Sequence, residues 1–135
     1  MNIMFFLTTK RNVTFLYEDE TVMTGLRKLK NSGYRAIPVI SRSGISRGAI
    51  TEGDFLWLMV GYNEILGGEK TSSLLIRDMP QSFSNPPVSC ECSLTDVLKQ
   101  AAQYNFVPVV DGRDVFIGII TRKRIIEYCL STMKT

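Results

Sequence analysis

The sequence contains one internal repeat, which limits the folds that the chain can adopt. The segments Tyr34–Ile40 and Asn105–Val110 are both apolar around a proline, and the two prolines lie 70 residues apart. The Gly-x-x-Thr patterns that begin at Gly48 and Gly118 are separated by the same 70 residues. Self-similarity at a fixed spacing is typical of a chain that carries one structural unit twice. The sequence therefore predicts two copies of one unit.

Each copy predicts the order helix, strand, strand, helix. In the first copy, Thr21 suits the N-cap and Gly33 the C-terminal residue of a helix whose apolar positions recur every three or four residues. Strands over 36–40 and 47–51 flank a turn, and a helix follows from Glu52. The second copy repeats the order with a helix from Ser93, strands over 106–110 and 115–121, and a helix to about Thr132.

Neither copy is large enough to bury its own apolar surface well. A unit of about 50 residues is marginal alone, whereas two units packed together can share a core. We therefore expect one compact α+β body with approximate internal two-fold symmetry and clefts where the copies meet. The expected boundaries are residues 1–66 for the first copy with a packed N-terminal segment, 67–75 for a less ordered connection and 76–135 for the second copy.

Composition restricts the chemistry of the chain. It has 135 residues and no histidine, which removes the commonest general base near neutral pH and the commonest metal ligand. Cys90, Cys92 and Cys129 show no disulfide-framework spacing and fit a reducing compartment. The Cys90-x-Cys92 pair is a weak metal or redox signal, so we interpret it as structural and expect no metal. No nucleophile has a recognisable activating partner, so we expect no enzyme activity.

Charge and hydropathy give little support for a macromolecular ligand. A net charge of +3 permits an anionic small molecule but does not predict nucleic-acid binding. The apolar runs at 3–7 and 55–60 are far shorter than the roughly 20 residues of a membrane span. The N-terminus also lacks the pattern of a signal peptide. We expect a cytoplasmic protein with no membrane and no nucleic-acid partner.

The clearest binding chemistry lies where the second strand of the first copy turns into a helix. Thr51 and Asp54 would sit at the start of that helix, where free N–H groups and the helix dipole favour anions. Thr51 could hydrogen-bond a phosphate, and the carboxylate of Asp54 could accept from the vicinal hydroxyls of a ribose. The same residues could instead be an N-cap and an acid that suits the helix dipole. The residue types alone leave both readings open.

The repeated pattern resembles a known family. An apolar-Arg-Ala-Ile-Pro-Val motif, a glycine turn and Gly-x-x-Thr-x-x-Asp, complete in the first copy and partial in the second, are similar to a tandem pair of CBS domains (a Bateman module). The similarity covers residues 13–59 and 88–130, and Ile76–Met79 resembles the segment that precedes a repeat in this family. The resemblance implies a free-standing module of two β-α-β-β-α repeats related by pseudo-two-fold symmetry.

The resemblance also implies a ligand and its binding residues. In this family the Thr and Asp of the motif bind phosphate or ribose oxygens of an adenosine nucleotide, and the base lies against the apolar strand. Carried over to the first copy, the ligand-binding residues are Arg35, Ala36, Ile37, Pro38, Thr51 and Asp54. The second copy keeps Thr121 but has Arg124 in place of the Asp, and we align its Phe106 with Arg35. A guanidinium cannot accept from a ribose diol, so this second site should lack normal ribose recognition.

A basic segment follows Thr121. Thr121–Ile126 is similar to a segment in the nucleotide-binding subunit of AMP-activated protein kinase, where basic residues reach phosphates held at the other repeat. By that analogy Lys123, and with it Arg122, would join Arg35 around a phosphate. The alternative is a solvated helix start, although positive charge at a helix N-terminus is locally unfavourable.

Two functions follow as hypotheses. The leading one is a non-catalytic regulatory sensor that binds an adenine nucleotide in the cleft between the repeats, the candidates being AMP, ADP, ATP, S-adenosylmethionine and cyclic di-AMP. The alternative is a dimerisation or interaction scaffold whose nucleotide site is degenerate, a reading motivated by Arg124. The resemblance implies a homodimer, parallel or antiparallel, with Trp57 and Met59 facing the core or the dimer contact. An unidentified effector protein is a further expected partner.

Overall fold

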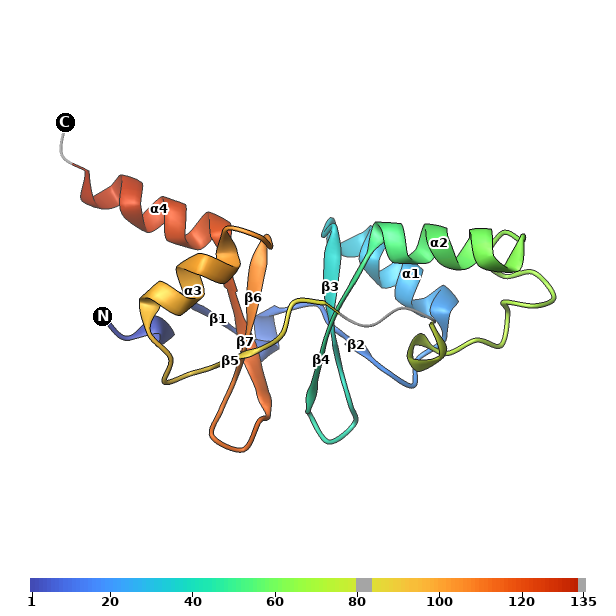
Figure 1. The fold of residues 1–135 in the computed structure, drawn as a ribbon, viewed down its shortest axis with the longest axis horizontal. Helices are drawn as coiled ribbons and strands as arrows, with labels where there is room; N and C mark the ends of the chain where they lie inside the picture. The colour runs from blue at the N-terminus through green and yellow to red at the C-terminus, as the bar shows by residue number, and fades with distance from the viewer. Residues whose placement is uncertain (80–83, 134–135) are drawn as a thin grey trace. The chain divides into compact units, whose positions relative to one another are not determined.

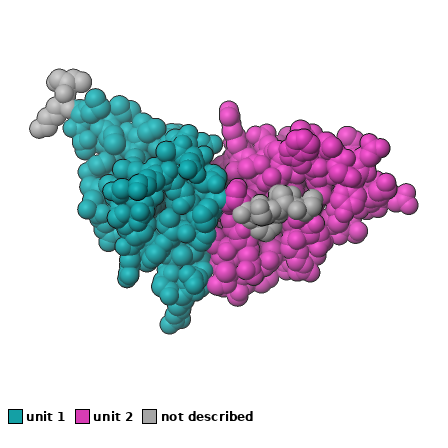
Figure 2. Space-filling model, viewed as in Figure 1, with its two compact units in different colours: residues 1–13, 85–135 teal, residues 14–84 magenta. Residues whose placement is uncertain are grey.

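The computed structural model of the chain describes residues 1–79 and 84–133. The chain divides into two compact units, shown in separate colours in Figure 2. Unit 2 is Thr14–Ser84, and unit 1 combines Met1–Val13 with Asn85–Thr135. Each unit contains a small sheet and two α-helices, which confirms the expected α+β class.

Unit 2 has a three-stranded sheet with two helices on one face (Figure 1). Its elements are β2 (Leu16–Tyr17), α1 (Val22–Ser32), β3 (Ala36–Ile40), β4 (Ser46–Thr51), α2 (Glu52–Tyr62) and the short 3-10 helix η3 (Ile76–Asp78). The strand order is β2-β3-β4, with β2 parallel and β4 antiparallel to β3. Fully buried side chains from the strands and from both helices form one apolar core, with Ile37, Ile50 and Phe55 among them.

The end signals of α1 confirm the sequence prediction. The Thr21 hydroxyl accepts from the backbone N–H of Thr24 at 3.1 Å, which satisfies one of the free donors at the helix start. Gly33 ends the helix in the left-handed conformation, with φ of 73°, which costs glycine little. Local sequence therefore sets both ends of this helix.

Unit 1 repeats this arrangement and adds a strand from the N-terminus. Its elements are β1 (Leu7–Thr9), β5 (Val88–Ser89), α3 (Leu94–Ala101), β6 (Phe106–Val110), β7 (Phe116–Thr121) and α4 (Arg122–Thr132), with 3-10 helices η1 (Ile3–Phe6) and η2 (Lys10–Asn12). The strand order is β1-β7-β6-β5, and α3 and α4 pack on the sheet (Figure 1). Val97, Val107 and Ile120 lie in its core with no exposed surface.

The N-terminal segment packs with the second repeat. Strand β1 pairs antiparallel with β7, and Phe6 is buried against the rings of Phe5 and Tyr128. Residues 1–13 were expected to accompany the first repeat, so the compact units differ here from the expected boundaries. The physical reason is that the free edge of β7 offers N–H and C=O groups that β1 satisfies.

The segment after α2 is more organised than its glycine and serine content predicts. One carboxylate oxygen of Glu64 accepts from the backbone N–H groups of Lys70 and Thr71 at 2.8 and 2.7 Å. Burial alone would raise the pKa of Glu64, but the hydrogen bonds from Thr71 and Lys70 outweigh it and hold the pKa below its ordinary value. Thr71 is buried, and Leu66 joins the unit 2 core. The connection is thus a hydrogen-bonded loop.

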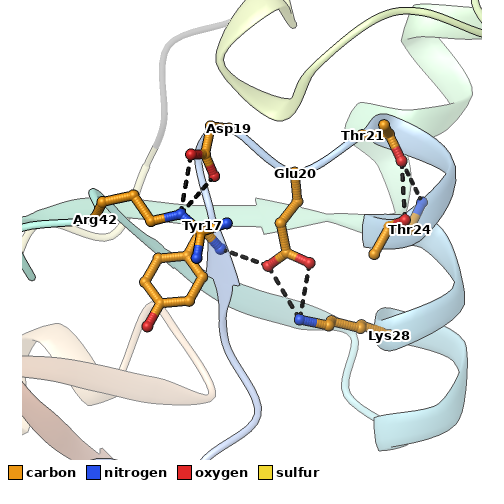
Figure 3. Close-up of polar contacts among 7 residues, drawn as sticks. All are labelled: Tyr17, Asp19, Glu20, Thr21, Thr24, Lys28 and Arg42. Atoms are coloured by element: carbon orange, nitrogen blue, oxygen red, sulfur yellow. Dashed lines mark hydrogen bonds and ion pairs between the residues drawn. The ribbon is translucent and has the colours of Figure 1, made fainter.

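Charged side chains fix the turn between β2 and α1 (Figure 3). The Nε of Arg42 donates to both carboxylate oxygens of Asp19 at 2.9 Å, and its guanidinium lies 3.9 Å from the centre of the Tyr17 ring. Glu20 accepts from the Tyr17 N–H and from Lys28. These contacts join the turn to the β3–β4 hairpin and to α1.

The Asp19–Arg42 pair should make unit 2 sensitive to acid. The hydrogen bond from Arg42 holds the pKa of Asp19 below its ordinary value, so this pair stabilises the fold above the unfolded pKa of about 3.9 and loses its effect as the pH falls through the folded pKa. We expect Asp19→Asn to lower the urea midpoint at pH 7 and to converge with the wild type below pH 3.

The control for this experiment is Glu91→Gln in unit 1. Glu91 occupies the position equivalent to Asp19, but Gly112 stands where unit 2 has Arg42. The urea midpoint of Glu91→Gln should equal that of the wild type at both pH 7 and pH 3. An Asp19→Asn deficit that is equally large at pH 7 and pH 3 would contradict the electrostatic account.

Candidate functional site

Thr51 and Asp54 form a reciprocal pair at the start of α2. The Thr51 hydroxyl accepts from the Asp54 N–H at 3.2 Å, and the Asp54 Oδ2 accepts from the Thr51 N–H at 2.8 Å. This is a complete capping box, so the structural reading of both residues is confirmed. The Thr-x-x-Asp spacing carries this signal in the sequence, since the Asp54 carboxylate lies three residues after the Thr51 N–H that it accepts from.

Capping leaves binding capacity at the same two side chains. The hydroxyl hydrogen of Thr51 remains a donor, and within residues 1–79 and 84–133 Asp54 Oδ1 has no hydrogen-bond partner. Both side chains are half-buried. The capping box fixes their orientation at the positive end of α2, where an anion or a hydroxyl group could be bound.

The pairing of β3 with β4 brings Arg35 and Ala36 next to this pair. Ala36 lies opposite Thr51 in the sheet, and the Arg35 carbonyl accepts from the Glu52 N–H at 3.1 Å. The Arg35 side chain is exposed and Ala36 is half-buried. Four predicted ligand residues, Arg35, Ala36, Thr51 and Asp54, therefore share one end of the unit 2 sheet.

Ile37 and Pro38 lie on opposite faces of β3. The Ile37 side chain has no exposed surface and belongs to the apolar core beneath α1 and α2. Side chains alternate along a strand, so Ala36 and Pro38 share the other face. A base placed against β3 would contact that second face, on which Ala36 is half-buried and Pro38 is buried.

The equivalent junction in unit 1 lacks the reciprocal contact. Thr121 accepts from the Arg124 N–H at 3.0 Å, so Thr121 is an N-cap like Thr51. Arg124 has no acceptor atom with which to complete a capping box. Its guanidinium lies over the ring of Phe5, 5.7 Å from the ring centre. Phe5 of the N-terminal segment is therefore a contact partner of Arg124, the residue that stands in place of the motif aspartate.

The strand register corrects one alignment between the repeats. Phe106 lies opposite Thr121, as Ala36 lies opposite Thr51, and the Asn105 carbonyl accepts from the N–H that follows Thr121. Asn105 is thus the counterpart of Arg35, and the alignment of Phe106 with Arg35 was wrong by one residue. Phe106 is a bulky, buried substitute for the small Ala36.

The basic turn of α4 separates into two kinds of side chain. Arg122 is half-buried, and its Nε donates to the Ala101 carbonyl at 2.8 Å, close to the C-terminal end of α3. Lys123 and Arg124 are exposed. The sequence pattern could not anticipate the bond between Arg122 and α3, because it joins residues 21 positions apart. Of the two predicted ligand residues in this turn, Lys123 is thus more accessible than Arg122.

Cys90 and Cys92 pack as small apolar side chains. They are half-buried against the unit 1 core, whereas Cys129 is exposed. Burial and the nearby charge of Asp96 raise the pKa of the Cys92 thiol. In residues 1–79 and 84–133, no group of three or more potential metal ligands comes together. The contacts support the structural interpretation of the pair.

This environment predicts the order in which the thiols react. With iodoacetamide at pH 8, Cys129 should be alkylated first and Cys92 at least about fivefold more slowly, because a half-buried thiol with a raised pKa has less thiolate and is less accessible. Peptide mass spectrometry measures both rates. In urea the two rates should become similar, and a fast-reacting Cys92 in the folded protein would contradict the packing.

The helices of both units are short. None of those in the described part of the chain is long and apolar enough to cross a membrane.

Comparison with solved structures shows that the fold is shared. A CBS domain protein from Streptococcus pneumoniae is 27% identical, with a TM-score of 0.83 over 94% of this chain and 85% of that one. A structure of CbpB in complex with c-di-AMP is 22% identical, with a TM-score of 0.86 over 97% and 85% of the two chains. CBSX2 in complex with AMP is 24% identical, with a TM-score of 0.75 over 96% of each chain.

Sequence comparison gives the family directly. No curated protein sequence matches the chain significantly. The family model for the CBS domain, however, matches twice, over residues 7–61 and 76–131. These ranges contain both strand-to-helix junctions and cover most of the chain. The chain therefore belongs to the CBS domain family and carries two CBS domains in tandem.

Proposed function

We propose that this protein is a regulatory, non-catalytic module that binds an adenine nucleotide at the start of α2. The observation that carries the proposal is the Thr51–Asp54 capping box. It orients a hydroxyl donor and an unengaged carboxylate oxygen at the positive end of a helix. The pair suits a ribose hydroxyl beside a phosphate, and Arg35 lies at the same end of the sheet.

Proteins of the same fold support the choice of ligand. CbpB binds c-di-AMP and CBSX2 binds AMP in the structures named above. We therefore place AMP and cyclic di-AMP first, ahead of ADP, ATP and S-adenosylmethionine. We assign the phosphate to Arg35, the ribose to Asp54, and the base to the face of β3 that carries Ala36 and Pro38. The second repeat keeps the threonine of the Thr-x-x-Asp motif, Thr121, but not the aspartate.

We further propose that the protein forms a homodimer. Leu56, Trp57 and Val60 on α2 are 57%, 70% and 59% exposed, and Ile126 and Leu130 on α4 are also more than half exposed. The Trp57 side chain therefore does not face the core, whereas Met59 is packed against the unit 2 core. Exposed apolar faces of this kind are typical of interaction surfaces.

Titration calorimetry of the purified protein with the five candidate ligands tests the nucleotide proposal. We expect saturable binding of AMP or cyclic di-AMP and a rise in melting temperature, because a ligand that binds only the folded state stabilises it. The nucleotide proposal is refuted if none of the five ligands, at millimolar concentration, gives a heat of binding or raises the melting temperature. That result would leave the alternative, a dimerisation scaffold with a degenerate nucleotide site, which is motivated by Arg124 in place of the motif aspartate.

A further inference from the structure

Unit 2 contains a hollow of about 650 Å³ between α1 and α2. Its lining comes from both helices and from the turn that joins α1 to β3. The volume lies within the range of about 300–1,000 Å³ that is usual for small-molecule sites. The nucleotide base proposed above would contact the face of β3 that points away from these helices, so the hollow is a separate place in the fold.

The greater part of the lining of this hollow is apolar. Two buried and two half-buried side chains contribute to it: Leu29, Phe55, Leu26 and Met59. Of the exposed α2 residues proposed above for the homodimer, Leu56 lines the hollow, whereas Trp57 and Val60 do not. Most of the apolar lining is therefore separate from that surface and could contact an apolar ligand.

Three charged side chains also line the hollow. Lys30 in the last turn of α1 and Arg35 in the turn before β3 are cations, and Glu52 in the first turn of α2 is an acid. Within residues 1–79 and 84–133, none of these three side chains forms an ion pair or a hydrogen bond. Two cations and one acid leave the described lining with one net positive charge, which suits a ligand with a single negative charge.

We propose that this hollow is a second binding site, for a small molecule that joins an apolar chain to one carboxylate. The apolar chain would cover the leucine and methionine side chains of the lining, and the carboxylate would bind Lys30 and Arg35. Arg35 is also the residue assigned above to the nucleotide phosphate. Because both ligands use its charge, each should weaken the binding of the other. Only this competition rests on the proposed function.

Octanoate is the probe for the first test, and octan-1-ol is the uncharged ligand of the same chain length. In protein labelled at the methionine methyl groups, the NMR signal of Met59 should shift saturably with octanoate, because Met59 lines the hollow. The signal of Met23, which is in the same unit but outside the hollow, should not shift. Octan-1-ol should bind at least about threefold more weakly. No shift of Met59 at millimolar octanoate, or equal binding of the two probes, would overturn the site.

Charge variants provide the second test. Lys30→Gln and Arg35→Gln should each weaken octanoate binding at least about threefold, whereas Glu52→Gln should strengthen it, because the first two remove an attraction and the third removes a repulsion. Arg27→Gln is the matched control, since Arg27 is exposed on α1 three residues before Lys30 and does not line the hollow. Its affinity for octanoate should equal that of the wild type. The same affinity in all four variants would show that the hollow does not recognise the anion, and would overturn the proposal.

Calorimetry separates this inference from the nucleotide proposal. Saturating octanoate should lower the affinity for AMP or cyclic di-AMP at least about threefold in the wild type, and Arg35→Gln should show no such dependence. A protein that binds octanoate but no nucleotide keeps the hollow as a site and removes the sensor and the competition. Nucleotide binding that octanoate does not change keeps both sites and removes the competition for Arg35. Nucleotide binding without octanoate binding removes the hollow alone.

Discussion

Replacing Asp54 with asparagine should weaken the binding of AMP or cyclic di-AMP at least about tenfold. The amide oxygen can still accept from the Thr51 N–H, so the start of α2 keeps its cap. The variant loses the negative charge, and its NH₂ group replaces the unengaged Oδ1 acceptor proposed for the ribose. A hydrogen bond to a charged group contributes about 1.5–3 kcal/mol, and 1.4 kcal/mol corresponds to a factor of ten. Calorimetry measures the change in affinity.

Asp78→Asn is the matched control for this measurement. The Asp78 carboxylate also accepts from a backbone N–H three residues earlier, that of Leu75 at 3.0 Å, but it lies on η3. Its substitution should leave the nucleotide affinity unchanged. If Asp54→Asn binds as tightly as Asp78→Asn does, then Asp54 is only a cap and the proposed site is wrong.

The elements that the sequence predicted well are those set by local chemistry. Thr21 and Gly33 bound α1 as expected, because an N-cap hydroxyl and a left-handed glycine act within one turn of the helix. The repeat placed β3 and β6 correctly, because prolines within short apolar runs mark both. The Thr51–Asp54 pair could also be found, since its capping contact spans only three residues.

Long-range contacts could not be predicted from the same patterns. Strand β1 is three residues long, and its sequence pattern does not indicate which strand it pairs with. It nevertheless pairs with β7, more than 100 residues away. The bond from Arg122 to Ala101 likewise depends on how α3 and α4 pack. The motif also does not show which strand residues face the core: Ile37, predicted as a ligand residue, has no exposed surface, because alternate residues of a strand face opposite ways.

Replacing Gly118 with alanine should lower the free energy of unfolding of unit 1 by about 2–4 kcal/mol. Gly118 has φ of 154°, which is unfavourable for residues with a side chain, and a Cβ there would overlap the Thr8 carbonyl oxygen. Backbone strain costs about 1–3 kcal/mol and overpacking a similar amount. Because that carbonyl belongs to the backbone, β1 must move away from β7, and the Phe6 side chain, which directly precedes β1, then loses its packing.

Gly112→Ala separates this effect from a general cost of replacing glycine. Gly112 lies in the β6–β7 turn, and an added Cβ meets nothing within 4 Å. We expect its urea midpoint to stay near that of the wild type. Limited proteolysis should then cut Gly118→Ala, but not Gly112→Ala, faster within the first 13 residues, because β1 no longer protects them. Equal stability and equal cleavage of the two variants would mean that the β1–β7 pairing contributes little to the fold.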